Sequence, residues 1–249
     1  MIVLQLGSQG PTVSDWQRTL KLAGFPVELD GDFGAETEAA TRAFQRRARI
    51  TADGEVGDET RAAAAHFATP ANSATPHTFP ELLLRVAASQ VGTRETSENQ
   101  GPGIEKYWRA TNYPEGYADR APWCAAFLCW VVATSMTDAR LNPGLTEANR
   151  PQTAGAKDWI NWAAGKATRE FVTVLSPTRA TPRPGDVIVY TFSHIGLCES
   201  YDSRRVPALR CVEGNTNSDG SREGVEVLIH PRPMAQVQAI IRFGTGGKA

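Results

Sequence analysis

Cysteine is the residue type in this chain with the clearest potential for chemistry. The four cysteines include no Cys-x-x-Cys pair, so their spacing fits no zinc site. Cys124 follows Pro122 and opens the apolar run 123–132, which predicts a place in the first turn of a helix. The positive end of a helix can lower a thiol pKa from ~8.5 toward ~4–7. Cys129 lies deeper in the same run, where we expect packing, so Cys124 is the candidate nucleophile.

Two strand-like runs, 194–198 and 211–215, lie on either side of a polar stretch. If the hairpin between them centres near residues 204–205, Cys198 lies opposite Cys211. The two could then form a cross-strand disulfide outside the cytosol, but we expect thiols because the chain has no Sec signal.

His194 is the candidate base for the thiol, and the same register supplies its neighbours. Side chains alternate between the two faces of a strand, so His194 would lie opposite Asn215. Glu213 would be its diagonal neighbour, within reach of a long side chain. The pattern predicts a Cys–His pair whose imidazole is oriented by a carboxylate and an amide.

The elements that would carry these residues change type along the chain. Apolar stripes predict helices within residues 81–136 and at 154–164. Short β-branched or aromatic runs follow, at 171–175, 186–192, 195–201, 209–213, 225–229 and 237–243. Helices followed by strands predict an α+β domain, with helices packed on an antiparallel sheet.

The N-terminal part contains an internal repeat. The run Asp30–Thr37 (DGDFGAET) recurs as Asp53–Thr60 (DGEVGDET). In each copy glycines can take positive φ, and acids can cap the helix that follows. With a further apolar stripe over 12–23, the pattern predicts a small three-helix domain. The proline-rich stretch that follows is typical of a linker. The expected boundaries are 1–68 for the first domain, 69–80 for the linker and 81–249 for the second domain.

Composition narrows the partners. A net charge of −1 gives no reason to expect nucleic acid or an anionic membrane. No run of about 18 apolar residues could span a bilayer. The first residues lack the basic and apolar parts of a Sec signal, so we expect synthesis in the cytoplasm without Sec export.

The N-terminal motifs resemble the small helical peptidoglycan-binding domain. The resemblance covers nearly all of residues 4–65 and implies a link to the bacterial cell wall. It rests on Leu6–Pro11, Trp16-Gln17, Asp30–Gly34, Phe44-Gln45 and Asp53-Gly54, in that order. The glycines and acids of these motifs are equally well explained as turn residues, so no sugar ligands are assigned among them.

The second segment resembles the papain-like CHAP domain, a cysteine, histidine-dependent amidohydrolase/peptidase. The similarity spans about residues 82–245. It rests on Pro122–Ala125, Gly185–Val187, Ser193–Gly196 and Glu213–Asn215, with Asn99–Pro102 and Tyr107 upstream. The resemblance implies that Cys124 is the nucleophile and His194 the general base, with Glu213 and Asn215 as the orienting pair.

Substrate contacts and metals are less clearly marked. Trp123, beside the nucleophile, is the candidate substrate-binding residue, with core packing as the alternative. The Cys124 backbone N–H is the expected oxyanion donor. The acidic calcium-binding loop of some relatives has no counterpart at 112–120, where Glu115 and Asp119 are the acids. We expect no metal and no cofactor.

Together the two resemblances imply an endolysin-like peptidoglycan hydrolase. It would cleave the N-acetylmuramoyl-L-alanine amide or a peptide bond of the stem or cross-bridge. Two kinds of protein fit this activity: a phage lysis enzyme released through a holin, and a cell-wall-degrading toxin delivered by a secretion apparatus, which would have an immunity partner. We expect a monomer that acts in the periplasm or cell wall. The alternatives are a non-catalytic wall-binding or tail protein and an ordinary papain-like protease.

Overall fold

The computed structural model describes residues 3–23, 25, 27–48, 50–67, 76–217 and 224–244. The chain divides into two compact units, Met1–Ser73 and Ala74–Ala249, and each is described by itself. Residues 69–75, most of the expected linker, lie outside the described residues. Helix α5 begins at Phe79, because the Thr78 hydroxyl accepts a hydrogen bond from the Glu81 N–H and Pro80 suits a first turn.

The first unit is the expected three-helix domain. Its helices are α1 (Pro11–Leu22), α2 (Ala35–Ala48) and α3 (Asp58–Phe67). Apolar side chains from all three helices and the intervening turns form one core. Within that core Trp16 meets Phe44 edge to face, with ring centroids 5.5 Å apart.

A buried glutamine organises the first copy of the repeated turn. Gln17 Nε2 donates to Asp30 Oδ1 (2.7 Å), to the Asp32 carbonyl (2.9 Å) and to Thr37 Oγ1 (3.1 Å). The Gly31 N–H donates back to Gln17 Oε1 at 2.9 Å. Gly31 has a φ of 74°, which glycine adopts without strain.

The second copy repeats this arrangement atom for atom. Gln45 Nε2 donates to Asp53 Oδ1 (2.7 Å), to the Glu55 carbonyl (2.8 Å) and to Thr60 Oγ1 (3.0 Å). The Gly54 N–H donates to Gln45 Oε1 at 2.8 Å. The repeated motif therefore builds two turns, each held by a glutamine from the preceding helix.

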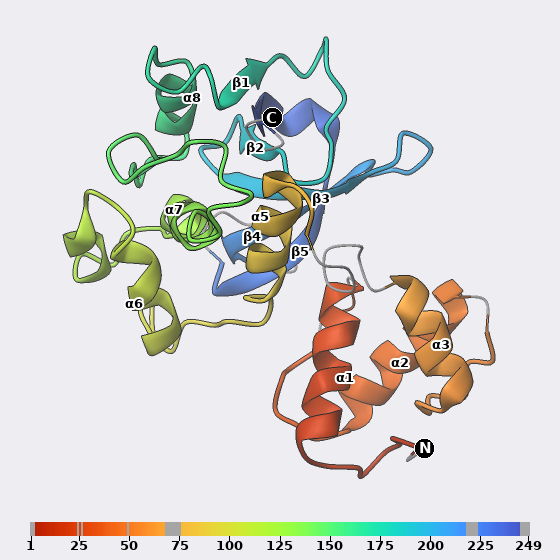
Figure 1. Cartoon of the computed structure of the whole chain (residues 1–249). Helices are drawn as coiled ribbons and strands as arrows, with labels where there is room; N and C mark the ends of the chain where they lie inside the picture. The colour runs from red at the N-terminus through yellow and green to blue at the C-terminus, as the bar shows by residue number, and fades with distance from the viewer. Residues whose placement is uncertain are drawn as a thin grey trace. The chain divides into compact units, whose positions relative to one another are not determined.

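The second unit is α+β, as expected (Figure 1). Its helices are α5 (Phe79–Ala88), α6 (Pro102–Trp108), α7 (Cys124–Ser135) and α8 (Asp158–Ala163), with 3-10 turns η1 (Pro114–Tyr117) and η2 (Met234–Gln236). Its strands are β1 (Val172–Leu175), β2 (Val187–Tyr190), β3 (Ile195–Tyr201), β4 (Leu209–Thr216), β5 (Glu226–Arg232) and β6 (Val237–Phe243). They form one antiparallel sheet in the order β1-β6-β2-β3-β4-β5.

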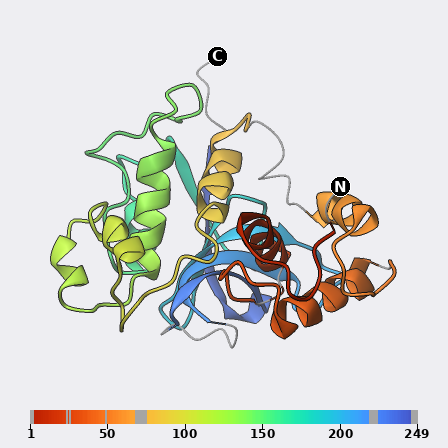
Figure 2. The same ribbon diagram turned by 90° about the horizontal axis from the view of Figure 1, so that it is seen from below.

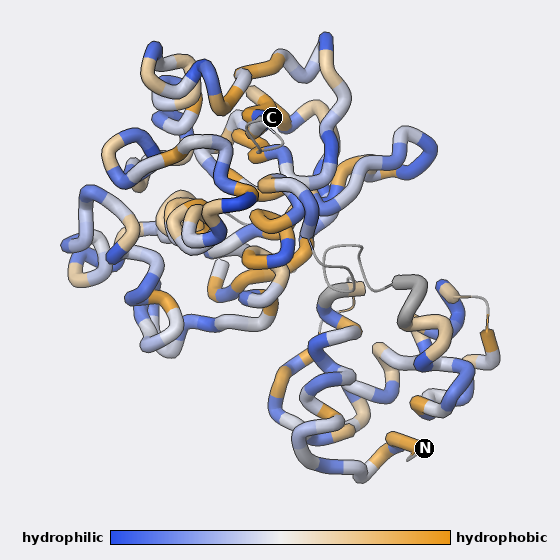
Figure 3. The backbone as a smooth tube through the Cα atoms, in the orientation of Figure 1, coloured by the Kyte–Doolittle hydropathy of each residue, from blue (hydrophilic) through white to orange (hydrophobic). Residues whose placement is uncertain are grey.

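Helix α7 is the central helix of this unit. It packs on β3 and β4, and α5 lies beside it in both views (Figures 1 and 2). Most of its side chains are buried, as the apolar sequence of the helix requires. Figure 3 shows hydrophobic segments along α5 and α7 where they meet the sheet. Among the described residues, no helix is both long and apolar enough to cross a membrane.

Candidate active site

Cys124 lies where the sequence predicts, at the first residue of α7. Its side chain is 5% exposed. The backbone N–H groups of a first helical turn have no partner within the helix, so this end can stabilise a negative charge. Cys129, one turn further along, is fully buried, and burial raises the pKa of its thiol to about 12. The structure therefore separates the two cysteines as expected.

His194 lies in the tight connection between β2 and β3 and is fully buried. Ser193 before it has a φ of 60°, and the His194 carbonyl accepts a hydrogen bond from the Tyr190 N–H (2.9 Å). The imidazole stacks on the ring of Phe192, with centroids 5.8 Å apart and planes 13° apart. The turn and the stacking fix the plane of the imidazole ring.

The two ring nitrogens of His194 have different surroundings. Nε2 is 3.0 Å from Oε2 of Glu213, as the predicted diagonal contact requires. Nδ1 is buried and has no hydrogen-bond partner of ordinary geometry in the described part of the chain. Cys124 nevertheless lies close enough for its charge and hydrogen-bonding capacity to raise the pKa of the imidazole. The imidazole therefore stands between a carboxylate and a thiol.

Charge at the site follows from these contacts. Burial opposes the imidazolium, but attraction and hydrogen bonding by Cys124 and Glu213 outweigh it and raise the pKa of His194 to about 10. Burial also opposes the Glu213 carboxylate, yet hydrogen bonds from Arg232 and His194 lower its pKa to about 2. At neutral pH this arrangement favours an imidazolium beside a carboxylate, which is a state that can donate a proton.

A glycine makes room for Glu213. A Cβ atom at Gly196 would lie 2.7 Å from Glu213 Cγ, so the position tolerates no side chain. The predicted pairing of Cys198 with Cys211 is confirmed, and both are buried free thiols. The strand register that brings Glu213 to His194 was therefore predictable.

Asn215 does not orient His194, contrary to the expectation. A β-bulge between Glu213 and Thr216 breaks the alternation of faces, and Asn215 takes a φ of 54°. Its Oδ1 accepts a hydrogen bond from the Trp123 N–H (3.1 Å). Its Nδ2 donates to Asn99 Oδ1 (3.0 Å) and to the Gly224 carbonyl (2.6 Å). The amide thus holds the turn in front of Cys124.

Trp123 is a core residue, which contradicts the expected substrate contact. Its side chain is 0% exposed, and its ring stacks on Tyr107 with centroids 5.6 Å apart. A Cβ atom at Gly214 would lie 2.7 Å from the indole, so the sheet approaches the ring closely. Core packing, the alternative reading, accounts for this residue.

Two members of the buried cluster were not anticipated, Tyr190 and Arg232. The Tyr190 hydroxyl donates to Glu213 Oε1 (2.8 Å), and Arg232 donates to both oxygens of the same carboxylate. The expected strand ended at residue 229, whereas β5 runs on to Arg232. The sequence feature that could have pointed to Arg232 is a single arginine between two prolines at the end of this strand. Among the described residues, no group of three or more His, Cys, Asp or Glu is placed to hold a metal ion.

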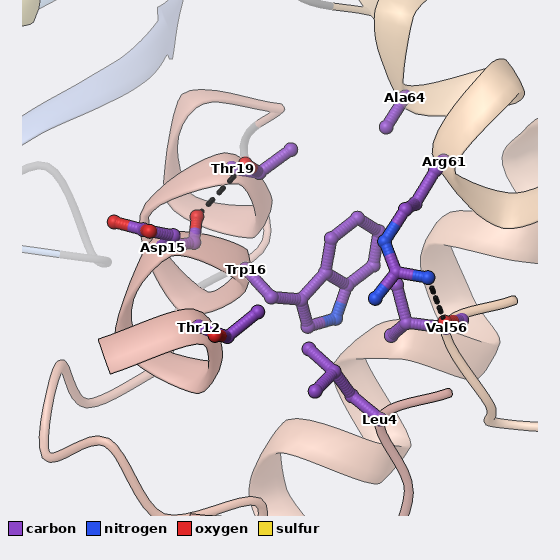
Figure 4. Close-up of a pocket in the computed structure, with 8 residues that line it drawn as sticks. All are labelled: Leu4, Thr12, Asp15, Trp16, Thr19, Val56, Arg61 and Ala64. Carbon is purple, nitrogen blue, oxygen red and sulfur yellow. Dashed lines mark hydrogen bonds between the residues drawn. The ribbon is translucent and has the colours of Figure 1, made fainter. Parts of the chain in front are cut away.

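The N-terminal unit has a pocket of its own, of about 320 Å³ (Figure 4). The lining residues are Leu4, Thr12, Asp15, Trp16, Thr19, Val56, Arg61 and Ala64. In Figure 4 the Arg61 side chain reaches toward the indole of Trp16, while the Asp15 carboxylate points away from it. The Thr19 hydroxyl bonds to the Asp15 carbonyl (2.9 Å). The surface is therefore mainly apolar, with a guanidinium at one side.

Comparison with known proteins agrees with the two-unit organisation. Residues 9–64 match a family model for a peptidoglycan binding domain, and residues 113–215 match the model for the CHAP domain. No curated protein matches the chain. Among solved structures, the crystal structure of the Burkholderia AP3 phage endolysin is similar at 31% identity, with a TM-score of 0.26. That alignment covers 34% of this chain and 32% of the endolysin, about a third of its length. The chain thus contains a peptidoglycan-binding domain followed by a CHAP domain.

Proposed function

We propose that the protein is a peptidoglycan hydrolase that cleaves an amide of the bacterial cell wall with Cys124 as nucleophile. The two domain families support a cell-wall hydrolase. The observation that carries the cysteine mechanism is the buried His194, bonded through Nε2 to Glu213 and interacting with Cys124. A His held between a carboxylate and a thiol is the arrangement that thiol hydrolases need.

The proposed reaction has two steps. The sulfur of Cys124 attacks the carbonyl carbon, the C–N bond breaks, and the imidazolium of His194 gives its proton to the leaving amine. Water then attacks the thioester while His194 takes a proton from it, and the C–S bond breaks. The Cys124 backbone N–H is the proposed donor to the oxyanion in both steps. Glu213 holds the ring so that Nδ1 faces the sulfur.

The N-terminal unit would keep the enzyme on its insoluble substrate. We propose the pocket over Trp16 as its wall-contacting surface, because the first acid and the glycine N–H of each of the two turns are engaged in their own hydrogen bonds. Holding the catalytic unit near the wall raises the effective concentration of scissile amides.

The scissile bond is either the N-acetylmuramoyl-L-alanine amide or a peptide bond. Mass spectrometry of fragments from purified walls distinguishes them, because a new N-terminal alanine indicates an amidase and a split peptide an endopeptidase.

The cysteine mechanism is tested by comparing the release of wall fragments by the wild type and by Cys124→Ala. We expect release by the wild type alone, and equal release by both would refute the cysteine mechanism. Failure of both to release material would favour the non-catalytic wall protein.

A further inference from the structure

Arg232 is a buried cation at the end of β5, only 4% exposed. Its Nε lies 2.9 Å from Glu213 Oε1, and its Nη2 bonds to Oε2 of the same carboxylate. The guanidinium also lies over the rings of Tyr190 and Phe192, 5.2 and 5.1 Å from their centroids. Burial of a guanidinium is unfavourable unless it is paired this well.

The Glu213 carboxylate is surrounded by donors from two strands, β2 and β5, and from the connection before β3. Oε1 accepts from Tyr190 and Arg232, and Oε2 accepts from His194 and Arg232. Cys211, on the same strand as Glu213, is a further titratable group that interacts with it. A carboxylate has about four lone-pair sites, and these four hydrogen bonds occupy them. Protonation of Glu213 would therefore displace a donor.

We propose that Arg232 is a positioning residue, which keeps Glu213 ionised and turned toward His194 so that the imidazole retains its proton. This inference rests on the proposed function. Without Arg232, a fully buried carboxylate would have one cation left, and it could take the proton from His194. The pair would then be a carboxylic acid and a neutral imidazole, which has no proton to give to a leaving amine.

The aromatic rings couple the arginine to the histidine geometrically as well. Phe192 stacks on His194 and lies under the Arg232 guanidinium, so one ring contacts both cations. A lysine could supply the charge but not the two-pronged contact with the carboxylate. Arg232→Lys should therefore act as a partial rescue of a neutral variant.

The test compares Arg232→Met with a matched control, Arg242→Met. Arg242 makes a similar two-bond pair with a buried carboxylate in the same sheet, at 2.8 and 2.7 Å from the oxygens of Asp186. The measurement is the pH dependence of Cys124 alkylation by iodoacetamide, with the modified peptide identified by mass spectrometry. Alkylation needs no wall substrate, so it tests Arg232 even if the wall-release assay refutes the proposed function.

We expect Arg232→Met to move the alkylation midpoint to higher pH by at least about one unit, a tenfold loss of rate below the midpoint. The midpoint of Arg232→Lys should lie between those of the wild type and Arg232→Met, and Arg242→Met should have the same midpoint as the wild type. A midpoint for Arg232→Met equal to that of Arg242→Met would overturn the proposal, as would a lysine variant shifted as far as the methionine variant. If Arg232→Met does not fold, Arg232→Gln removes the charge while keeping a donor, and an unshifted midpoint in that variant overturns the proposal equally.

Discussion

Both units contain buried polar clusters. The clusters differ in whether every buried nitrogen has a hydrogen-bond partner. In the N-terminal turns, the amide of Gln17 and that of Gln45 each have partners for both the oxygen and the nitrogen. In the CHAP unit the buried His194 has a partner at Nε2, but Nδ1 has no hydrogen bond of ordinary geometry in the described residues. A satisfied cluster stabilises a turn, whereas an unsatisfied nitrogen beside a thiol can accept and donate protons.

Both sets of residues stand out in the sequence, but for different reasons. The repeated Asp-Gly motifs are conspicuous because each turn needs a glycine with positive φ and an acid that accepts hydrogen bonds. The His194 and Glu213 motifs are conspicuous because a buried ion pair needs partners on neighbouring strands. A polar motif is thus evidence of function only where its hydrogen bonds leave a reactive group available.

The largest effect on the rate of wall hydrolysis is expected from removal of the imidazole that carries the unsatisfied nitrogen. His194→Ala removes the proton donor, so wall hydrolysis should fall by about 10²- to 10⁴-fold. His77→Ala, at an exposed imidazole, is the matched control and should keep full activity. Turbidity loss of purified walls is the measurement. Comparable rates for His194→Ala and the control would mean that the nitrogen has no catalytic role.

Removal of the carboxylate should change the pH profile. Glu213 helps to raise the pKa of His194, so Glu213→Gln should lower that pKa, and the imidazolium should be lost at a lower pH. Activity of the wild type should persist into alkaline solution and decline near pH 10, while the variant should decline earlier. The Asp186→Asn control breaks the other buried arginine pair and should leave the profile unchanged. An unshifted alkaline decline in Glu213→Gln would contradict this assignment.

The satisfied clusters should matter for stability alone. Gln45→Leu leaves the Gly54 N–H without its acceptor, which should lower the free energy of unfolding by about 1–3 kcal/mol. Gln17→Leu should have a similar effect on the first turn. Thermal unfolding measures the loss, and hydrolysis of soluble wall fragments at low temperature should be unchanged. A catalytic defect without loss of stability would show that the turns have a direct functional role.

The smallest effect is expected at the N-terminal pocket. Thr19→Arg places a long side chain in the pocket and removes one hydrogen bond from a hydroxyl to a backbone carbonyl. We expect the fraction of the variant that co-sediments with purified walls to be severalfold lower than that of the wild type. Thr51→Arg, the same change at an exposed site outside the pocket, should sediment as the wild type does. Unchanged sedimentation of both variants would exclude the pocket as the wall-contacting surface.

Local rules predicted the parts of the site that depend on regular structure. Helix position set Cys124 apart from Cys129, and strand alternation brought Glu213 to His194. The α+β arrangement and the three-helix domain also followed from periodicity and turn residues. These features depend on residues close in sequence or on one hairpin.

The errors arose where structure is irregular or distant in sequence. A bulge turned Asn215 away from the face that alternation assigned to it. Arg232 lies opposite Leu209 in the pairing of β4 with β5, so strand pairing alone does not predict that its side chain reaches Glu213. Trp123 is adjacent to the nucleophile in sequence, yet the helix start directs its ring into the core.

Stoichiometric alkylation can decide whether Cys124 is the nucleophile. The other three cysteines are fully buried, so limited iodoacetamide should label Cys124 first. If Cys124 is the nucleophile, wall hydrolysis declines in proportion to modification of Cys124 and is absent when one equivalent has reacted there. Activity that survives complete modification of Cys124, or that is lost only as another cysteine reacts, would contradict it.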